Sequence, residues 1–203
     1  MASHEDYQTA DIPGGSDDAP RFFLLHGTGG DEHQFIDLAA ELKPGARRIG
    51  VRGDVSESGA LRYFKRTGEG QYDMADLARA TEKLAAFVRR INAAASGGES
   101  LGLGYSNGAN ILASVLFAQP DQFDRSVLMH PLIPFTPPPQ PGLKGKRILA
   151  TAGRNDPIAP AQSAEALAAY FTAQGADVEI FWHDGGHEIR REELLAIQAF
   201  LAK

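Results

Sequence analysis

The stretch Leu101-Gly102-Leu103-Gly104-Tyr105-Ser106-Asn107-Gly108-Ala109-Asn110 decides the fold. An apolar start, the pattern Gly-x-Ser-x-Gly and a helix-like continuation predict a strand, a tight turn and a helix, with Ser106 at the tip of the turn. Gly104 and Gly108 leave room where the helix backbone crosses close to the strand. The motif predicts a nucleophile, with the Asn107 N–H beside it as half of an oxyanion hole. The alternative is a glycine-rich turn with an incidental serine.

Composition restricts the classes of protein to consider. The chain has 203 residues, is 43% hydrophobic and carries a net charge of −6. These values predict one domain over residues 1–203 and give no basic footprint for nucleic acid. The lack of cysteine excludes disulfides, thiolate nucleophiles and cysteine-bound metals. Residues 1–11 are polar and acidic, unlike a signal peptide, and no apolar run is long enough for a membrane span, so we expect a soluble, cytoplasmic protein.

The hydrophobic pattern alternates between strand-like and helix-like segments along almost the whole chain. Residues 1–20 are polar and predict an N-terminal extension, in which residues 7–12 form a short edge strand or a hairpin. Beyond them, strands are expected over 21–25, 46–51, 100–105, 126–129, 146–152 and 177–182. Helices are expected over 31–42 (with Asp31 as its cap), 73–95, 107–119, 161–174 and at the C-terminus. This order predicts an α/β fold, with a mostly parallel central sheet flanked by helices.

Three polar residues follow three of the expected strands. Ser106, Asp156 and His187 would therefore meet at the carboxyl end of the sheet, where such folds bind ligands. In that arrangement His187 takes the proton of Ser106, and Asp156 holds the imidazole and stabilises its cation. The chain order Ser, Asp, His is the order of α/β-hydrolases. The pattern thus predicts a catalytic triad.

A glycine-rich segment after the first buried strand supplies the remaining component. In His26-Gly27-Thr28-Gly29-Gly30, the backbone N–H of Thr28 can point at a developing oxyanion, with the Asn107 N–H as the second donor. We expect His26 itself to be structural, with hydrogen bonds inside the loop.

Candidates for the substrate pocket are less sharply defined. The cluster Arg62-Tyr63-Phe64-Lys65-Arg66 lies in a long aperiodic stretch, residues 52–73, which is typical of functional loops. Tyr63 and Phe64 therefore contact substrate, or they pack inward and leave surface charge around them. Further pocket candidates are Tyr105, Ile133 and Phe135, the last two in a proline-rich loop over 131–142 that could restrict the acyl site.

These segments together resemble the α/β-hydrolase superfamily. They look most like small bacterial carboxylesterases of the phospholipase/carboxylesterase group, which are relatives of acyl-protein thioesterases and of hydrolases linked to hydroquinone resistance. The matching segments are 25–32, 52–53, 62–64, Gly104-Tyr105-Ser106-Asn107-Gly108-Ala109-Asn110, Gly153-Arg154-Asn155-Asp156-Pro157-Ile158-Ala159-Pro160 and Gly186-His187-Glu188. The resemblance implies an α/β-hydrolase fold without a large lid domain, ester hydrolysis through an acyl-serine, and no cofactor. Acyl-protein thioesterases usually carry glutamine where this chain has Asn107, and this departure favours small esters.

Other site classes fit the sequence less well. The third glycine of a dinucleotide-binding loop would fall at Asn107. Neither segment 31–33 nor segment 183–187 has a pair of histidines four residues apart on a helix, as a metal site of that kind requires. We therefore expect no metal. The function expected is a serine carboxylesterase for short-chain or small aromatic esters. The alternatives are a lysophospholipase or thioesterase with the same triad, and a non-catalytic ligand-binding homologue. A homodimer is left open.

Overall fold

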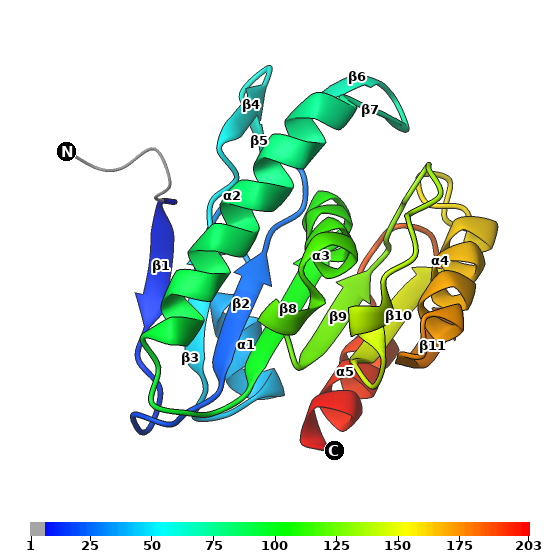
Figure 1. The fold of residues 1–203 in the computed structure, drawn as a ribbon. Helices are drawn as coiled ribbons and strands as arrows, with labels where there is room; N and C mark the ends of the chain where they lie inside the picture. The colour runs from blue at the N-terminus through cyan, green and yellow to red at the C-terminus, as the bar shows by residue number, and fades with distance from the viewer. Residues whose placement is uncertain (1–6) are drawn as a thin grey trace.

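A computed structural model describes residues 7–203 and contains a twisted seven-stranded sheet between two layers of helices (Figure 1). The strand order is β1-β3-β2-β8-β9-β10-β11, and all neighbouring pairs are parallel except β1 with β3. The strands of this sheet are β1 Thr9–Ile12, β2 Arg21–Leu25, β3 Arg47–Val51, β8 Ser100–Tyr105, β9 Arg125–Met129, β10 Arg147–Gly153 and β11 Asp177–His183. The helices are α1 Ile36–Leu42, α2 Met74–Ala93, α3 Asn107–Ala118, α4 Ala161–Ala173 and α5 Arg191–Ala202, with short 3₁₀ turns at Pro120–Gln122 and Pro141–Leu143.

The apolar runs form central strands because both of their faces are covered. Phe23 and Leu25 of β2 pack in the core under α2, α3 and α4, whereas Phe22 and Leu24 pack in the second core, under α1 and α5. Figure 1 shows α2, α3 and α4 in front of the sheet and α1 and α5 behind it. A strand buried on both faces reads as a continuous hydrophobic run, which is the pattern in the sequence. The predicted α/β-hydrolase fold class is confirmed.

Two local expectations are wrong. The first helix begins at Ile36 rather than after Asp31, because residues 31–35 form turns, in one of which the Asp31 carboxylate accepts a hydrogen bond from the His33 N–H. Residues 52–73 are not one aperiodic loop. They fold into two small hairpins, β4 Val55–Glu57 with β5 Ala60–Arg62, and β6 Arg66–Gly68 with β7 Gln71–Tyr72. Three-residue strands are too short to leave a period in the sequence.

The N-terminal segment contributes an edge strand, as one of the two expectations for it states. β1 pairs antiparallel with β3 and closes one side of the sheet. Residues 1–6, which belong to the expected polar extension, lie outside the described part of the chain.

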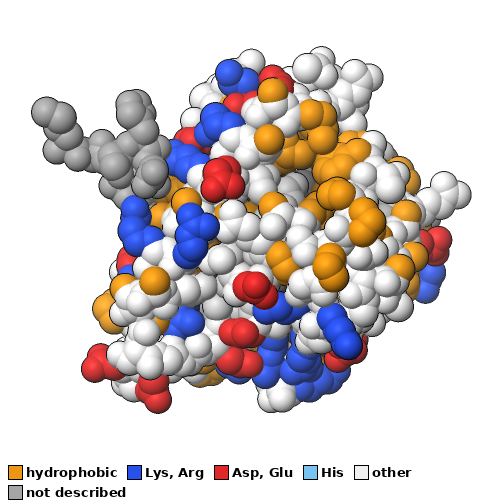
Figure 2. Space-filling view, viewed as in Figure 1, with side chains coloured by type: hydrophobic (Ala, Val, Ile, Leu, Met, Phe, Trp, Pro, Cys, Tyr) orange, Lys and Arg blue, Asp and Glu red, His pale blue; other side chains and the backbone are white. Residues whose placement is uncertain are grey.

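No helix among residues 7–203 is long and apolar enough to cross a membrane. Figure 2 shows hydrophobic side chains gathered at the upper right, on the side of α4 and the proline-rich segment.

Candidate active site

The turn between β8 and α3 presents Ser106 in a strained backbone conformation. Its φ of 52° and ψ of −114° lie in a region that side-chain-bearing residues rarely adopt. A Cβ on Gly104 would overlap the carbonyl of Gly108, and a Cβ on Gly108 would overlap the carbonyl of Leu25. The helix therefore starts in contact with the neighbouring backbone, and only glycine fits at both positions. This is the arrangement that the spacing Gly-x-Ser-x-Gly predicts.

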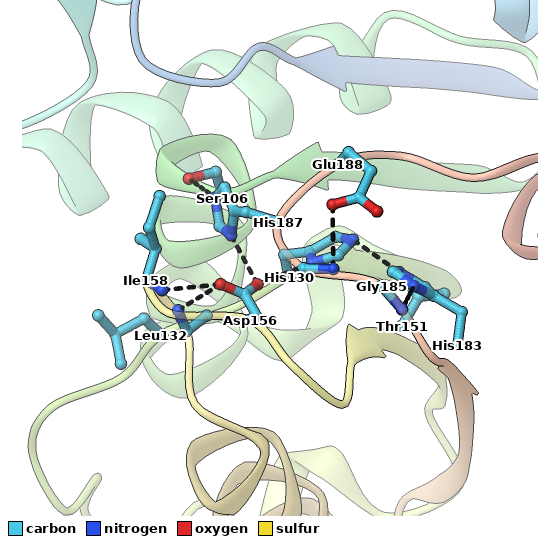
Figure 3. Close-up of polar contacts among 12 residues, drawn as sticks. Ser106, His130, Leu132, Thr151, Asp156, Ile158, His183, Gly185, His187 and Glu188 are labelled. Carbon is cyan, nitrogen blue, oxygen red and sulfur yellow. Dashed lines mark hydrogen bonds and ion pairs between the residues drawn. The ribbon is translucent and has the colours of Figure 1, made fainter.

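A continuous row of hydrogen bonds joins Ser106 to two residues that are distant in the sequence (Figure 3). The Nε2 atom of His187 lies 2.9 Å from Ser106 Oγ, and Nδ1 of the same ring lies 2.7 Å from Oδ2 of Asp156. Asp156 follows β10, and His187 follows β11, so parallel strands bring both to the end of the sheet where Ser106 lies. The structure therefore brings the three predicted catalytic residues together in the predicted order.

The carboxylate of Asp156 is buried and accepts four hydrogen bonds. Oδ1 accepts the N–H groups of Ile158 and Ala159, at 2.8 and 2.9 Å, and Oδ2 accepts from His187 and from a second histidine, His130, at 3.0 Å. Burial raises the pKa of the Asp156 carboxyl, but the Ala159 N–H and the two imidazoles more than offset this effect and leave that pKa below its ordinary value. Asp156 is consequently held as an anion.

A cavity of about 330 Å³ opens over Ser106 and His187. Thr28 and Asn107, the predicted oxyanion-hole residues, both line it. The hydroxyl of Thr28 accepts a hydrogen bond of 2.8 Å from Nη1 of Arg62, which fixes the glycine-rich segment to the first hairpin. Other residues of the wall are Arg66, Glu69, Gly70, Tyr72, Tyr105, Asn110, His130, Leu132 and Ile158. The cavity has the size for a small molecule and combines charged with apolar walls.

The pocket predictions for Tyr63 and Phe64 are wrong. Both side chains are fully buried and belong to the core under α2. The Tyr63 hydroxyl donates to the Val51 carbonyl and accepts from the His26 N–H, so its polar atom is used inside the protein. Of the two alternatives that the sequence left open, inward packing is the one found. The hairpin arginines that flank this pair, in contrast, reach the cavity.

The remaining pocket candidates divide into two groups. Tyr105 lines the cavity, and its hydroxyl donates to the carbonyl of His187, which connects β8 to the loop that carries His187. Ile133 and Phe135 line a separate groove of about 130 Å³ beside α4, away from Ser106. The proline-rich segment turns toward α4 at these positions, so their predicted contact with the acyl site is wrong. Leu132 instead lines the cavity from this segment.

His26 is structural, as expected. Its Nδ1 lies 2.7 Å from the Gly27 carbonyl, and its Nε2 accepts the Gly53 N–H at 2.9 Å. Burial lowers the pKa of its ring, which agrees with a neutral imidazole that accepts one hydrogen bond and donates another.

Sequence reasoning missed a buried polar cluster behind Asp156. His130 follows β9 directly, His183 ends β11 and Glu193 lies in the first turn of α5. All three are buried, and their ligand-type atoms lie within 4.8 Å of one another. A sequence signal exists for His130, because it is a polar residue directly after a buried strand, as Ser106 is. Nothing local in the sequence distinguishes Glu193 from its exposed helical neighbours.

A larger hollow lies at the opposite end of the sheet. It measures about 680 Å³ and lies at the amino ends of β2 and β3, where Arg21 and Arg47 face it. Both arginines are already paired, Arg21 with Asn92 and Arg47 with Asp11. The smaller cavity is the better candidate site, because it alone combines a strained serine, an imidazole and a buried carboxylate.

Comparisons with known proteins identify a family and several relatives of this chain. The model of the dienelactone hydrolase family matches residues 65–192. A protein of Bacillus subtilis (strain 168) named "Putative hydrolase MhqD" is 38% identical over 172 residues, which cover 84% of this chain and 86% of that protein. The carboxylesterase of Bacillus cereus is 32% identical with a TM-score of 0.92, covering 98% of this chain and 95% of that one. The protein Atu2452 of unknown function from Agrobacterium tumefaciens str. C58 is 52% identical with a TM-score of 0.91, over 100% and 98% of the two chains. The chain belongs to the dienelactone hydrolase family of the α/β-hydrolase superfamily.

Proposed function

We propose that this protein is a serine carboxylesterase that hydrolyses small esters through an acyl-serine intermediate. The observation that carries the proposal is the hydrogen-bonded row from Ser106 through His187 to Asp156 at the floor of a cavity. Family membership supports a hydrolase, and the Bacillus cereus relative is named a carboxylesterase.

The proposed reaction uses each of these groups in turn. His187 Nε2 takes the proton of Ser106 as its oxygen attacks the ester carbonyl, and Asp156 stabilises the imidazolium that forms. The backbone N–H groups of Thr28 and Asn107 bind the negative oxygen of the tetrahedral intermediate, each worth about 3 kcal/mol in the transition state. The imidazolium then protonates the leaving alcohol, and water hydrolyses the acyl-serine by the same path in reverse.

Cavity size and charge support small and polar substrates. A volume of about 330 Å³ lies at the low end for ligand sites, which favours a short acyl group over a long one. Arg62 and Arg66 line one wall, although Glu57 pairs with both of them. We therefore propose short-chain or small aromatic esters as substrates, ahead of lysophospholipids and long-chain thioesters.

Mass spectrometry of the intact protein after an organophosphonate probe tests the nucleophile. One adduct is expected in the wild type and none in Ser106→Ala. Ser58→Ala is the matched control, because Ser58 has the same positive φ of 52° but lies in the β4–β5 turn outside the cavity. A p-nitrophenyl ester series is run in parallel, with turnover expected to fall as the acyl chain lengthens. An unlabelled wild type without turnover would replace this proposal with a ligand-binding role.

A further inference from the structure

Asp156 has a second imidazole on the side away from Ser106. Figure 3 shows the row Ser106, His187 and Asp156 continuing to His130 and His183. His130 Nδ1 lies 3.0 Å from the same Oδ2 atom that accepts from His187, and the opposite nitrogen, Nε2, lies 3.4 Å from Oε1 of Glu193. The side chains of His130 and Glu193 are fully buried. One ring is thus placed between two buried carboxylates.

The backbone is strained to put this ring there. His130 is one of only three non-glycine residues with a positive φ in the described residues 7–203, and Ser106 is another. Its φ is 52°, and its N–H bonds to the Thr151 carbonyl of β10. A strained conformation is retained where the surrounding contacts determine it, and here those contacts are the ones around Asp156.

The neighbours of Glu193 fix which groups donate. The Thr151 hydroxyl and the Arg190 N–H both donate to its carboxylate. Nδ1 of His183 accepts the Gly185 N–H at 3.0 Å, so a neutral His183 carries its proton on Nε2. That Nε2 atom lies 3.7 Å from Oε2 of Glu193 and 3.4 Å from Nε2 of His130, so its proton points to the Glu193 carboxylate when His130 is protonated and to His130 Nε2 when that ring is neutral. Glu193 is therefore surrounded by donors, which favours its anionic form. Two anions then face His130 from opposite sides.

We propose that His130 is a positioning residue, a protonated imidazole between Asp156 and Glu193 that aligns the triad carboxylate and offsets part of its charge. This inference rests on the proposed triad. Burial lowers the pKa of the His130 ring, but Glu193 and Asp156 together raise it above its ordinary value. The same contacts hold the pKa of the buried Glu193 carboxyl below its ordinary value. The titratable groups that face the His130 ring are Tyr105 of β8, Asp156, His183 of β11, His187 and Glu193 of α5.

The cation at His130 acts on the catalytic base through Asp156. The rings of His130 and His187 are 5.2 Å apart, so a positive charge on His130 opposes a positive charge on His187. It therefore offsets part of the negative charge that Asp156 presents to His187. The Glu193 carboxylate adds one negative charge, so Asp156, His130 and Glu193 together carry a net charge of −1.

A bound metal is the competing explanation of the cluster. His130, His183 and Glu193 have ligand atoms close enough to hold one. A metal ligand at His183 Nε2 would need its proton on Nδ1, and the Gly185 N–H that points at Nδ1 opposes that tautomer. The hydrogen-bond pattern thus fits a shared proton better than a metal ion.

The pH profile of kcat/KM for p-nitrophenyl acetate tests the role. The acidic limb reports protonation of the base in the free enzyme. In His130→Asn, an amide N–H replaces the donor to Asp156 and tolerates the positive φ, but the cation is lost. The midpoint of the acidic limb should rise by about one pH unit. In Glu193→Gln a neutral amide faces the cation at His130 and stabilises it less. The midpoint of the acidic limb should therefore also rise, but by less than in His130→Asn.

His183→Gln is the matched control. It removes an equally buried but neutral imidazole, and glutamine retains an acceptor and a donor of similar reach. The limb is expected to stay within about 0.2 pH units of wild type, given that no charge changes. A limb that moves equally in His130→Asn and His183→Gln would assign the effect to packing and overturn the inference.

Nitrogen-15 NMR of the histidine rings supplies a readout that does not need esterase activity. Two protonated nitrogens on His130 at pH 7.5 in the wild type, and a higher titration midpoint of His187 in His130→Asn, would support the inference even if no ester is turned over. A neutral His130 ring, an unmoved midpoint or one zinc ion per chain by elemental analysis would each overturn it. An unlabelled Ser106 would overturn the proposed function alone.

Discussion

Replacing Asp156 by asparagine tests the triad with the least change in shape. The carboxylate accepts four N–H groups at 2.7–3.0 Å, two on each oxygen. Asparagine has only one oxygen, so in either orientation its NH₂ group faces two other N–H donors. If it faces the histidines, His187 must exchange its tautomer or turn away, and Nε2 then no longer accepts the Ser106 proton. If it faces Ile158 and Ala159, the turn that holds the residue opens.

The magnitude follows from counting these contacts. Hydrogen bonds to a charged group contribute about 1.5–3 kcal/mol each, so the loss of two corresponds to about 3–6 kcal/mol. We expect kcat/KM for p-nitrophenyl acetate in Asp156→Asn to fall about 10⁴-fold, as is typical of a triad with the wrong tautomer. The free energy of unfolding in urea should fall by about 3 kcal/mol, since the protein relaxes around part of the defect.

Asp184→Asn is the control, because Asp184 is close to His187 in the sequence but its side chain is 89% exposed. This variant should retain wild-type activity and stability. The reasoning is refuted if Asp156→Asn keeps more than about a tenth of the activity, or if its stability matches that of the control. Either result would mean that the four contacts do not hold the base.

Three further outcomes follow from the structure. Gly108→Ala should lower the free energy of unfolding in urea by about 3 kcal/mol, because its Cβ overlaps the carbonyl of Leu25 at the carboxyl end of β2. Glu32→Gln should cost about 1–2 kcal/mol at pH 7, since Arg52 bonds the buried Glu32 carboxylate and holds its pKa below the ordinary value. The depressed pKa means that this contribution is complete above the ordinary pKa of glutamate and is lost as the pH falls through the lower folded value, so the difference in stability between the two proteins should shrink as the pH falls below the ordinary pKa of glutamate. Tyr63→Phe should lower stability by about 2 kcal/mol, because two buried backbone groups lose their partner, and KM should change less than twofold in steady-state assays.

Patterns that repeat locally made most of the architecture predictable. Continuous apolar runs such as Phe22–Leu25 can be buried only between two layers, and they alternate with amphipathic helices, so a parallel sheet follows. The ends of parallel strands then collect Ser106, Asp156 and His187 without any further information. The carboxyl-end rule is geometric, which is why three loops far apart in the sequence are found in contact.

The pocket walls were not predictable in the same way. Tyr63 and Phe64 have the composition of a binding surface, but the hairpins of residues 52–73 turn them inward and turn Arg62 and Arg66 toward the cavity. Ile133 is directed to a second groove by a proline-rich segment that has no periodicity. In both places the direction of a side chain depends on loop conformation, which no hydrophobic pattern records.

The sequence by itself determined the fold class and the positions of the proposed nucleophile, base and acid, because these depend on residue type, spacing and the order of strands. Only the tertiary structure decided what surrounds them. His130 and Glu193 come from different elements and meet behind Asp156 because the sheet twist and the packing of α5 bring them there. A buried charge depends on every group within a few ångströms of it, so the state of the triad is set by contacts that have no signature along the chain.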